Sequence, residues 1–396
     1  MPTSLSSPAL TGRPLLRSVL TPGAIARAAA GWLSVAALAL AAPLLADPLP
    51  GAALLLALTA IVAVIVVAAG GVVQQAEGLA RRLGDPYGTL VLTLSIVVIE
   101  VVLIAAVLLG PGEHATIARD SVMAVSMIIL NLVLGLCLLV GGLRHGAMAL
   151  HRVGTSAYLV LLVALAMLAF ALPALIGAGG GYTAGQALVV AALTVAVYAF
   201  FLWRQTGAQA AEFQEVPSPV GPSPADRTAT ARTEQAAPLA ERVAMHRAEL
   251  ALRAALLLVT VLPIVLLSHH MAGLLDDALG RLGAPVALGG VLIAMIVFTP
   301  ESLTAVRAAL GGEIQRVVNL CHGALVSTLA LTIPTVLVIG QLTGQPIVLA
   351  ESPVNLLLLG VTLAVSAISA SAPRVTAVHG AVHLLLFAVY ALALFS

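Results

Sequence analysis

Two glutamates, Glu100 and Glu301, each lie inside a long apolar segment, and each is preceded by the same short pattern of residues. The pattern Arg-Leu-Gly-x-Pro begins at Arg82 before the first glutamate and at Arg281 before the second. A bare carboxylate within a bilayer is costly, so it must be protonated, paired or bound to a cation. The duplicated arrangement therefore predicts a transporter in which two repeats surround a cation site.

The apolar segment that follows each glutamate carries the pattern Asn-x-x-x-Gly, with Asn131 before Gly135 and Asn319 before Gly323. Amide oxygens are hard, neutral ligands that suit Na⁺ and Ca²⁺. A glycine four residues later lies on the same helical face and lets another helix approach closely. We therefore predict that Asn131 and Asn319 are cation ligands. The alternative is plain helix packing with an amide hydrogen bond.

Pro300 stands directly before the second glutamate and lacks a backbone N–H group, which frees the carbonyl of Ile296 as a further oxygen ligand. Neither glutamate segment contains an arginine, and Arg307 lies six residues past Glu301, where its side chain can extend to the membrane surface. The sequence therefore offers no obvious protein counter-charge to the two acids. This favours an exchangeable cation or proton.

Three further polar residues are weaker site candidates. Thr93 precedes Glu100 by seven residues and Thr304 follows Glu301 by three, so each threonine shares a helical face with its glutamate. Both are candidate ligands, although threonine in a helix often binds its own backbone instead. Glu77 precedes the first repeat and is a candidate for attracting cations to the entrance, with a solvated surface acid as the alternative.

Three histidines also lie in or beside apolar segments. His322 precedes the glycine of the second repeat, and His379 and His383 share one face of the last segment. Histidine titrates near neutral pH, so these residues are candidates for a proton relay. A structural histidine with satisfied hydrogen bonds is the alternative for each.

The composition predicts a polytopic membrane protein. The chain of 396 residues is 61% hydrophobic and 9% charged, whereas soluble domains carry roughly 25% charged residues. A net charge of +1 gives no basic footprint for nucleic acid. The sequence contains no zinc-protease, phosphate-loop or nucleophile-elbow motif, so we predict neither an enzyme nor a resident cofactor.

Eleven segments are long and apolar enough to span a bilayer, which needs about 20 residues. They are 28–46, 51–73, 88–110, 121–142, 155–177, 184–203, 251–274, 285–306, 318–340, 353–371 and 376–395. With a cytoplasmic N-terminus, sixteen arginines fall in inside loops and only Arg119 and Arg281 fall outside. We predict a multi-pass inner-membrane protein of that orientation. A cleaved signal peptide is the less favoured interpretation of the first segment.

The predicted organisation is all-α, with about eleven transmembrane helices in two inverted-topology repeats. The segment of Glu100 enters from the inside and that of Glu301 from the outside, which would permit alternating access. The expected parts are a cytoplasmic N-terminal segment (1–27), a first transmembrane half (28–203) with repeat 1 at about 82–142, a cytoplasmic proline-rich linker (204–250), and a second transmembrane half (251–396) with repeat 2 at about 281–340.

Several motifs resemble those of the bacterial calcium/proton antiporters of the ChaA type, in the calcium/cation antiporter superfamily. The resemblance covers most of the chain beyond residue 75, and Phe298-Thr299 stands where that pattern has aliphatic residues. The matching stretches are GDPYGTL at 84–90, VIEV at 98–101, GLCLLVGGLRH at 135–145, PESLTAVRAA at 300–309, LTIP at 331–334 and HGAVHL at 379–384.

The resemblance implies exchange of cytoplasmic Ca²⁺, or of Na⁺ and K⁺, for protons. It also implies that Glu100 and Glu301 ligate the cation and that Asn131 and Asn319 complete the site. We expect Ca²⁺/H⁺ exchange, in which Ca²⁺ and protons compete for the two glutamates. The alternatives are Na⁺ or K⁺/H⁺ antiport and, from another class, a passive channel or non-transporting membrane protein with structural acids. The sequence leaves the oligomeric state open.

Overall fold

The computed structural model describes residues 13–45, 49–83, 115–215, 239–283 and 286–395, with a few single residues between 94 and 108. Two predicted site residues, Glu100 and Thr93, lie outside the described residues, as does almost all of the expected span 88–110. The described part is all-α and contains only isolated β-bridges in place of strands. The predicted all-helical class is therefore confirmed.

The first half contains eight α-helices, two π-helical turns and a 3₁₀ turn within the described residues. They are α1 (Arg13–Val19), α2 (Pro22–Leu45), α3 (Gly51–Leu83), α5 (Ile117–Met127), the π-helical turn η1 (Ile128–Val133), α6 (Leu134–His145), α7 (Arg152–Ala166), the π-helical turn η2 (Met167–Ala171), α8 (Leu172–Ile176), α9 (Ala184–Thr206) and the 3₁₀ turn η3 (Ala210–Phe213). Each π-helical turn is continuous with its neighbours, so α5–η1–α6 and α7–η2–α8 each form one long rod.

The second half contains two long helices, two short ones and a final pair. They are α11 (Leu239–Leu282), α12 (Val286–Val297), α13 (Thr299–Leu310), α14 (Ile314–Thr343), α15 (Pro353–Ser371) and α16 (Ala377–Ala393). The expected span 285–306 is thus two helices in the structure rather than one. Within the described ranges, eight helical rods are long and apolar enough to cross a membrane, and α16 is a shorter apolar helix.

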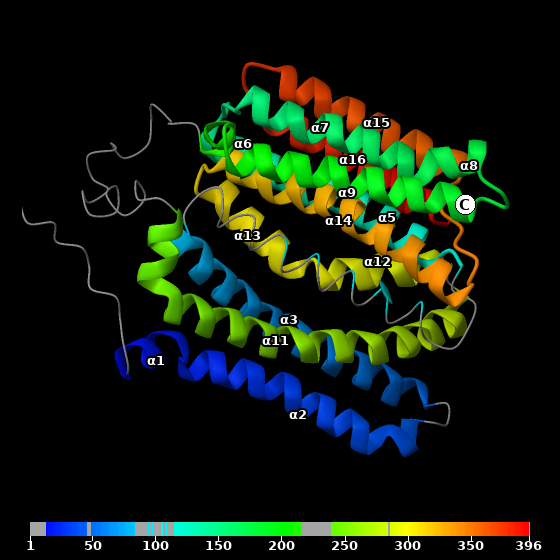
Figure 1. The fold of residues 1–396 in the computed structure, drawn as a ribbon. Helices are drawn as coiled ribbons and strands as arrows, with labels where there is room; N and C mark the ends of the chain where they lie inside the picture. The colour runs from blue at the N-terminus through cyan, green and yellow to red at the C-terminus, as the bar shows by residue number, and fades with distance from the viewer. Residues whose placement is uncertain are drawn as a thin grey trace, which may run out of the picture.

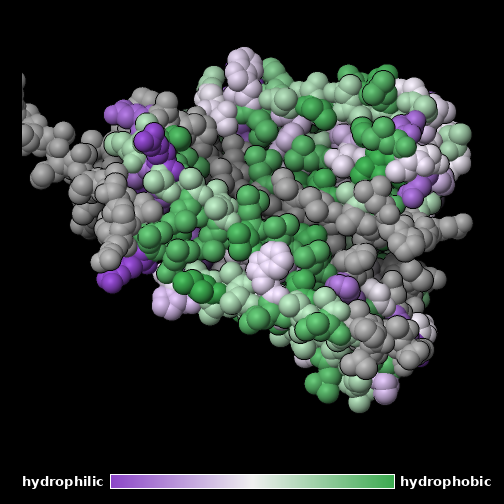
Figure 2. Space-filling model, turned by 60° about the horizontal axis from the view of Figure 1, so that its bottom comes forward, coloured by the Kyte–Doolittle hydropathy of each residue, from purple (hydrophilic) through white to green (hydrophobic). Residues whose placement is uncertain are grey.

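The helices form two packed groups (Figure 1). α2, α3 and α11 contact one another as one layer, at the bottom of the view. α12 and α13 lie between this layer and a larger bundle of α5–α6, α7, α9, α14, α15 and α16. Hydrophobic side chains cover much of the middle of the face in Figure 2, and hydrophilic ones gather mainly toward its ends. This distribution fits a multi-pass protein whose lipid-facing surface is apolar.

Hydrogen bonds between loops define the two ends of the helices. At one end His145 contacts the Leu310 carbonyl and Met148 pairs with Val375. This end, called the arginine-rich end below, carries Arg82, Arg144, Arg152, Arg204, Arg253, Arg307, Arg316 and Arg374, which lie at or near the helix ends that meet there. At the opposite end lie Arg119, which binds the Ala350 carbonyl, and Arg281, which binds the Leu49 carbonyl.

The chain after α9 packs back onto the arginine-rich end. Phe213 in η3 is buried, and the carboxylate of Glu215 accepts hydrogen bonds from the backbone N–H groups of Gln315 and Arg316. Residues 239–249, the last part of the expected linker, form the first turns of α11. α11 therefore continues from the polar region into the apolar layer without interruption in its helix.

A candidate cation site at a broken helix

The chain breaks its helix between α12 and α13, directly before Glu301. Phe298 joins the two helices with φ −84° and ψ 0°, and Pro300 occupies the first turn of α13. Because proline lacks an N–H group, the helix cannot run through this point with all its hydrogen bonds, and the Ile296 carbonyl loses its usual donor. The carbonyl end of α12 and the N–H end of α13 therefore meet beside the glutamate. These ends carry partial negative and partial positive charge respectively.

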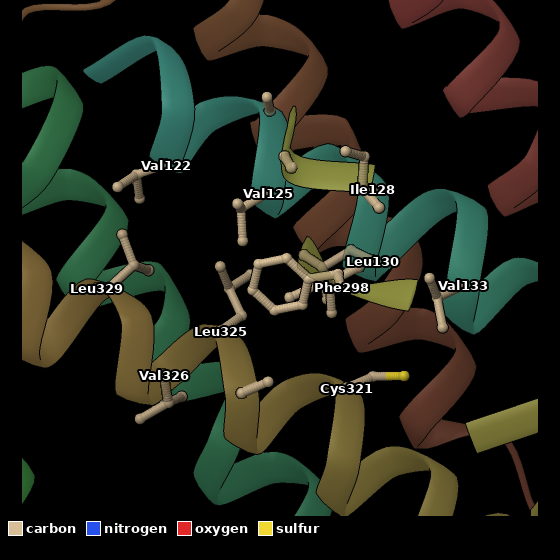
Figure 3. Close-up of a cluster of buried hydrophobic side chains, with 14 of the residues drawn as sticks. Val122, Val125, Ile128, Leu130, Val133, Phe298, Cys321, Leu325, Val326 and Leu329 are labelled. Atoms are coloured by element: carbon tan, nitrogen blue, oxygen red, sulfur yellow. The ribbon is translucent and has the colours of Figure 1, made fainter. Parts of the chain in front are cut away.

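The side chain of Phe298 anchors this break in the protein core. Figure 3 shows its ring between the α5–η1 rod and α14, beside Val125, Leu130 and Leu325. The ring is 1% exposed. An aromatic residue, where the sequence resemblance led us to expect an aliphatic one, thus fills the space at the break. Burial of the ring holds the start of α13 against its neighbours.

Glu301 lies in the first turn of α13 and is only 6% exposed. Backbone N–H groups at the start of α13 point toward this end of the helix, which carries partial positive charge. Thr304, one turn later on the same face, is also buried. The thiol of Cys321 on α14 lies within electrostatic reach of Glu301 and of Cys137 on α6. Both cysteines are free and buried.

Asn131 lies in the π-helical turn η1 and is fully buried. Its Nδ2 donates to Thr362 Oγ1 at 2.9 Å, and its Oδ1 lies 3.1 Å from Nδ1 of His383. Gly135, one turn later, permits this contact, because a Cβ there would lie 3.0 Å from the His383 Cβ. Asn131 therefore takes part in helix packing through both ends of its amide, and its role as a cation ligand stays a prediction.

Asn319 has different partners. Its Oδ1 accepts from Gln315 Nε2 at 3.0 Å, and its Nδ2 donates to the carbonyl of Phe213 in η3. It lies only five residues after the start of α14 at Ile314, which is about 8 Å along the helix axis. Asn131 lies fourteen residues after the start of its rod at Ile117, or about 21 Å along it. The two matched motifs therefore occupy different depths.

The residue at the depth of Asn131 in the second half is Thr328, fourteen residues after Ile314. Thr328 is fully buried. α13 and α14 run antiparallel, and helical side chains lean toward the N-terminus of their own helix. Glu301 on α13 and Thr328 on α14 therefore lean toward each other along the axis, whereas Asn319 leans away. Counting from the helix starts, rather than matching Asn-x-x-x-Gly, therefore pairs Asn131 with Thr328.

Of the remaining candidates, His322 and His383 line one small cavity, whereas His379 and Glu77 lie elsewhere. Nδ1 of His379 accepts a hydrogen bond from the Thr376 backbone N–H at 3.1 Å and so caps the start of α16. Glu77 is half-buried on α3 in the other layer. His322 on α14 stacks on the ring of Tyr158, with centroids 6.2 Å apart. In the part of the chain that the structure describes, no three acid, histidine or cysteine side chains gather to hold a metal ion.

Comparison with known proteins places this arrangement in a family. The sequence profile described as sodium/calcium exchanger protein matches residues 53–207 and 252–396, one stretch on each side of the linker. The chain belongs to the sodium/calcium exchanger family. The resemblance seen in the sequence motifs is thereby confirmed, and the members of this family are membrane ion antiporters.

Curated and solved members of the family extend the comparison. The sodium-potassium/proton antiporter ChaA of Escherichia coli (strain K12) is 32% identical over 82% of this chain and 85% of its own length. The solved structure of native YfkE has a TM-score of 0.62 at 13% identity, covering 96% of this chain and 99% of that one. The H⁺/Ca²⁺ exchanger CAX gives 0.61 at 13% identity, covering 96% and 89%. These two structures establish the fold.

Proposed function

We propose that this member of the sodium/calcium exchanger family is a secondary active cation/proton antiporter, with Ca²⁺ as the expected cation. The observation that carries the proposal is the burial of Glu301 at the N-terminal end of a helix that begins at a break within a span. A cation and a proton can each neutralise that carboxylate, so the two ions compete for one group. Exchange then follows from alternate occupancy as the site faces each side of the membrane.

The proposed site also includes Glu100 from the first repeat, which follows from the duplicated sequence frame. Ca²⁺ takes six to eight oxygen ligands. Besides the two carboxylates, the hydroxyls of Thr304 and Thr328 and the carbonyls freed at the break are the proposed sources. In this scheme Asn131 supports the site through its contacts to α15 and α16 instead of binding the cation directly.

Stoichiometry follows from charge in this proposal. Leaving two bare carboxylates in the membrane would be costly, so the site reorients only when both are neutralised. One Ca²⁺ or two protons accomplish this, which gives at least two protons exchanged for each Ca²⁺. Counting the protons released per Ca²⁺ in proteoliposomes tests the scheme, and a ratio clearly below two contradicts it.

Na⁺ or K⁺ exchange is the second candidate, because the curated Escherichia coli relative carries that function in its name. Monovalent ions need fewer charged ligands, and one carboxylate with hydroxyl and carbonyl oxygens would suffice. We further propose an inner-membrane location with the arginine-rich end in the cytoplasm, which follows from the positive-inside rule. Inverted repeats about the site would supply the two orientations.

The test uses inverted membrane vesicles with an imposed pH gradient, to which Ca²⁺, Na⁺ or K⁺ is added. Wild type is compared with Glu301→Gln, Glu100→Gln and a control, Glu241→Gln, whose side chain is exposed on the first turn of α11. We expect Ca²⁺ to dissipate the gradient in wild type and control but in neither site variant. A response to Na⁺ or K⁺ alone selects the second candidate. Wild-type behaviour of both site variants would rule out the proposed site.

A further inference from the structure

A small cavity lies between five helices near the arginine-rich end, apart from the break at Phe298. Its volume is about 20 Å³, and residues of α6, α7, α14, α15 and α16 line it, most of them apolar. Four of the lining residues each carry a buried polar atom that has no hydrogen-bond partner within the described residues. These atoms are Thr155 Oγ1, His322 Nε2, Ser366 Oγ and His383 Nε2. Buried polar atoms are nearly always paired, so four in one cavity indicate a polar occupant.

The hydrogen bonds of the two histidines fix the character of the atoms that face the cavity. Nδ1 of His322 lies 3.3 Å from the Val318 carbonyl, which only accepts, so Nδ1 carries the proton. Nδ1 of His383 lies 3.1 Å from Asn131 Oδ1, which also accepts, because Asn131 Nδ2 donates to Thr362. In the neutral rings both Nε2 atoms are therefore basic lone pairs, and both belong to the lining of one small cavity.

The cavity has room for one water molecule, which needs at least about 10–15 Å³ and two to four polar partners. A water there can donate to both imidazole nitrogens and accept from the two hydroxyls, which would satisfy all four atoms. A proton that arrives on this water can bond to either Nε2, leaving neutral water and one imidazolium. Its return to water restores the neutral ring, so the step is balanced and reversible.

The surroundings favour a passing proton over a resident charge. The sequences of the five helices contain no Asp or Glu, so an imidazolium would have no carboxylate from them. Besides the two cavity histidines, the five helices carry these titratable groups: Cys137, Arg144 and His145 on α6, Arg152 and Tyr158 on α7, Arg316 and Cys321 on α14, and His379 and Tyr390 on α16. Cys321, the neighbour of His322 in the chain, is the group within electrostatic reach of Glu301.

We propose that the His322–His383 cavity is a hydrated proton-transfer site that connects the arginine-rich end with the cation site. This inference rests on the proposed proton coupling and adds two residues to it. His383 joins the cavity to the cation-site region through Asn131. His322 joins it to α14 beside Cys321. The two basic nitrogens would accept protons from the aqueous side and return them as the carboxylates exchange.

The experiment uses His322→Asn and His383→Asn in the full chain in proteoliposomes. Asparagine places an N–H donor near the position of Nδ1 but removes the basic Nε2. Two rates are measured with the cation that drives wild-type exchange. One is cation-driven proton movement, and the other is tracer self-exchange of that cation without a pH gradient, which needs no net proton transfer. His246→Asn, on the polar part of α11, is the matched control.

We expect the double variant to lose about 100-fold in proton movement, the lower range for a positioned proton-transfer group, while tracer exchange stays at the wild-type rate. A parallel fall of both rates, or no fall in either, overturns the inference. If the histidine variants do not fold, Thr155→Val with Ser366→Ala decides, because it removes only the hydroxyls that hold the water. Slower proton movement with intact tracer exchange supports the site, and no change overturns it. If the wild-type protein itself exchanges tracer cation but shows no cation-driven proton movement, the proposed antiport function is refuted instead.

Discussion

Asn131 and Asn319 have the same sequence frame but different places in the protein. Asn131 lies deep in the α5–η1–α6 rod, where it connects α15 and α16 through Thr362 and His383. Asn319 lies near the start of α14, where it holds the segment after α9 through the Phe213 carbonyl. The first therefore ties together helices of the core. The second ties a surface segment to the arginine-rich end.

The difference shows what a repeated motif does and does not specify. Asn-x-x-x-Gly defines one face of one helical turn, since its residues are four apart. It does not define how far that turn lies from the helix end, and depth decides which neighbours a side chain meets. In the second half, the residue that lies as far from its helix start as Asn131 does is Thr328. Four substitutions test this comparison.

The largest effect is expected for Asn131→Ala. It removes the partner of Thr362 and of His383 in a fully buried location, leaving both groups unsatisfied. We expect a loss of about 2–3 kcal/mol in the free energy of unfolding, together with impaired exchange. Thermal unfolding in detergent and the vesicle assay measure the two effects. A variant as stable as wild type would show that the two hydrogen bonds contribute little.

The glycines of the two motifs provide a second test. A Cβ at Gly135 would lie 3.0 Å from the His383 Cβ and 3.1 Å from the Gly380 carbonyl oxygen, whereas a Cβ at Gly323 first meets Tyr158 Oη at 3.4 Å. Gly135→Ala should therefore destabilise the protein by about 1–2 kcal/mol through overpacking. Gly323→Ala serves as the matched control and should be close to neutral. Equal melting temperatures for the two variants would contradict the close approach of α16 to α6.

Thr328→Val tests whether depth predicts a ligand. Valine keeps the shape of threonine but removes the hydroxyl oxygen, so a cation that uses this oxygen should bind more weakly. We expect about a tenfold rise in the cation concentration for half-maximal exchange, equivalent to about 1.4 kcal/mol. Ser327→Ala, one residue away and bonded to Tyr198, is the control. An unchanged half-maximal concentration in Thr328→Val removes Thr328 from the site.

The smallest effect is expected for Asn319→Ala. It releases the Phe213 carbonyl and the Gln315 side chain, both buried near the start of α14, at a cost of about 1 kcal/mol in the free energy of unfolding. Because Asn319 leans away from Glu301, the cation dependence of exchange should not change. Measuring the half-maximal cation concentration checks this. A tenfold rise there would return Asn319 to the list of ligands and would weaken the argument from depth.

The sequence predicted the membrane class and most helices well, because long apolar runs have few structural alternatives in a bilayer. It also located the break, in part, through Pro300 beside Glu301. It did not predict that 285–306 would form two helices, since the apolar run continues through Phe298 and a proline within a span often causes only a kink. The family resemblance pointed to the repeated motifs, but it did not show how far along its helix each motif residue lies.

The two-histidine cavity shows why the rest could not be predicted. His322 and His383 were individually identified as relay candidates, but Thr155, Thr362 and Ser366 were not. These residues are hydroxyl side chains of the kind that commonly bind their own helix backbone. Their role emerges only where five helices from distant parts of the chain meet, and one sequence alone does not specify those contacts. Glu100 and Thr93 lie outside the described residues, so their roles stay predictions.

The length of α11 and its ion pair with α3 allow the two helices to move together. The 44 residues of α11 span about 66 Å, roughly twice the hydrocarbon thickness of a bilayer. At the arginine-rich end, Glu249 of α11 is buried and binds both Arg82 of α3 and Arg253 of its own helix. The ion pair between Glu249 and Arg82 thus joins α3 and α11, the two longest described helices, where α11 leaves the apolar layer. A force applied to residues 239–249, such as a bound partner would exert, would tilt α11, and α3 would tilt with it because the two helices are joined at Glu249 and Arg82.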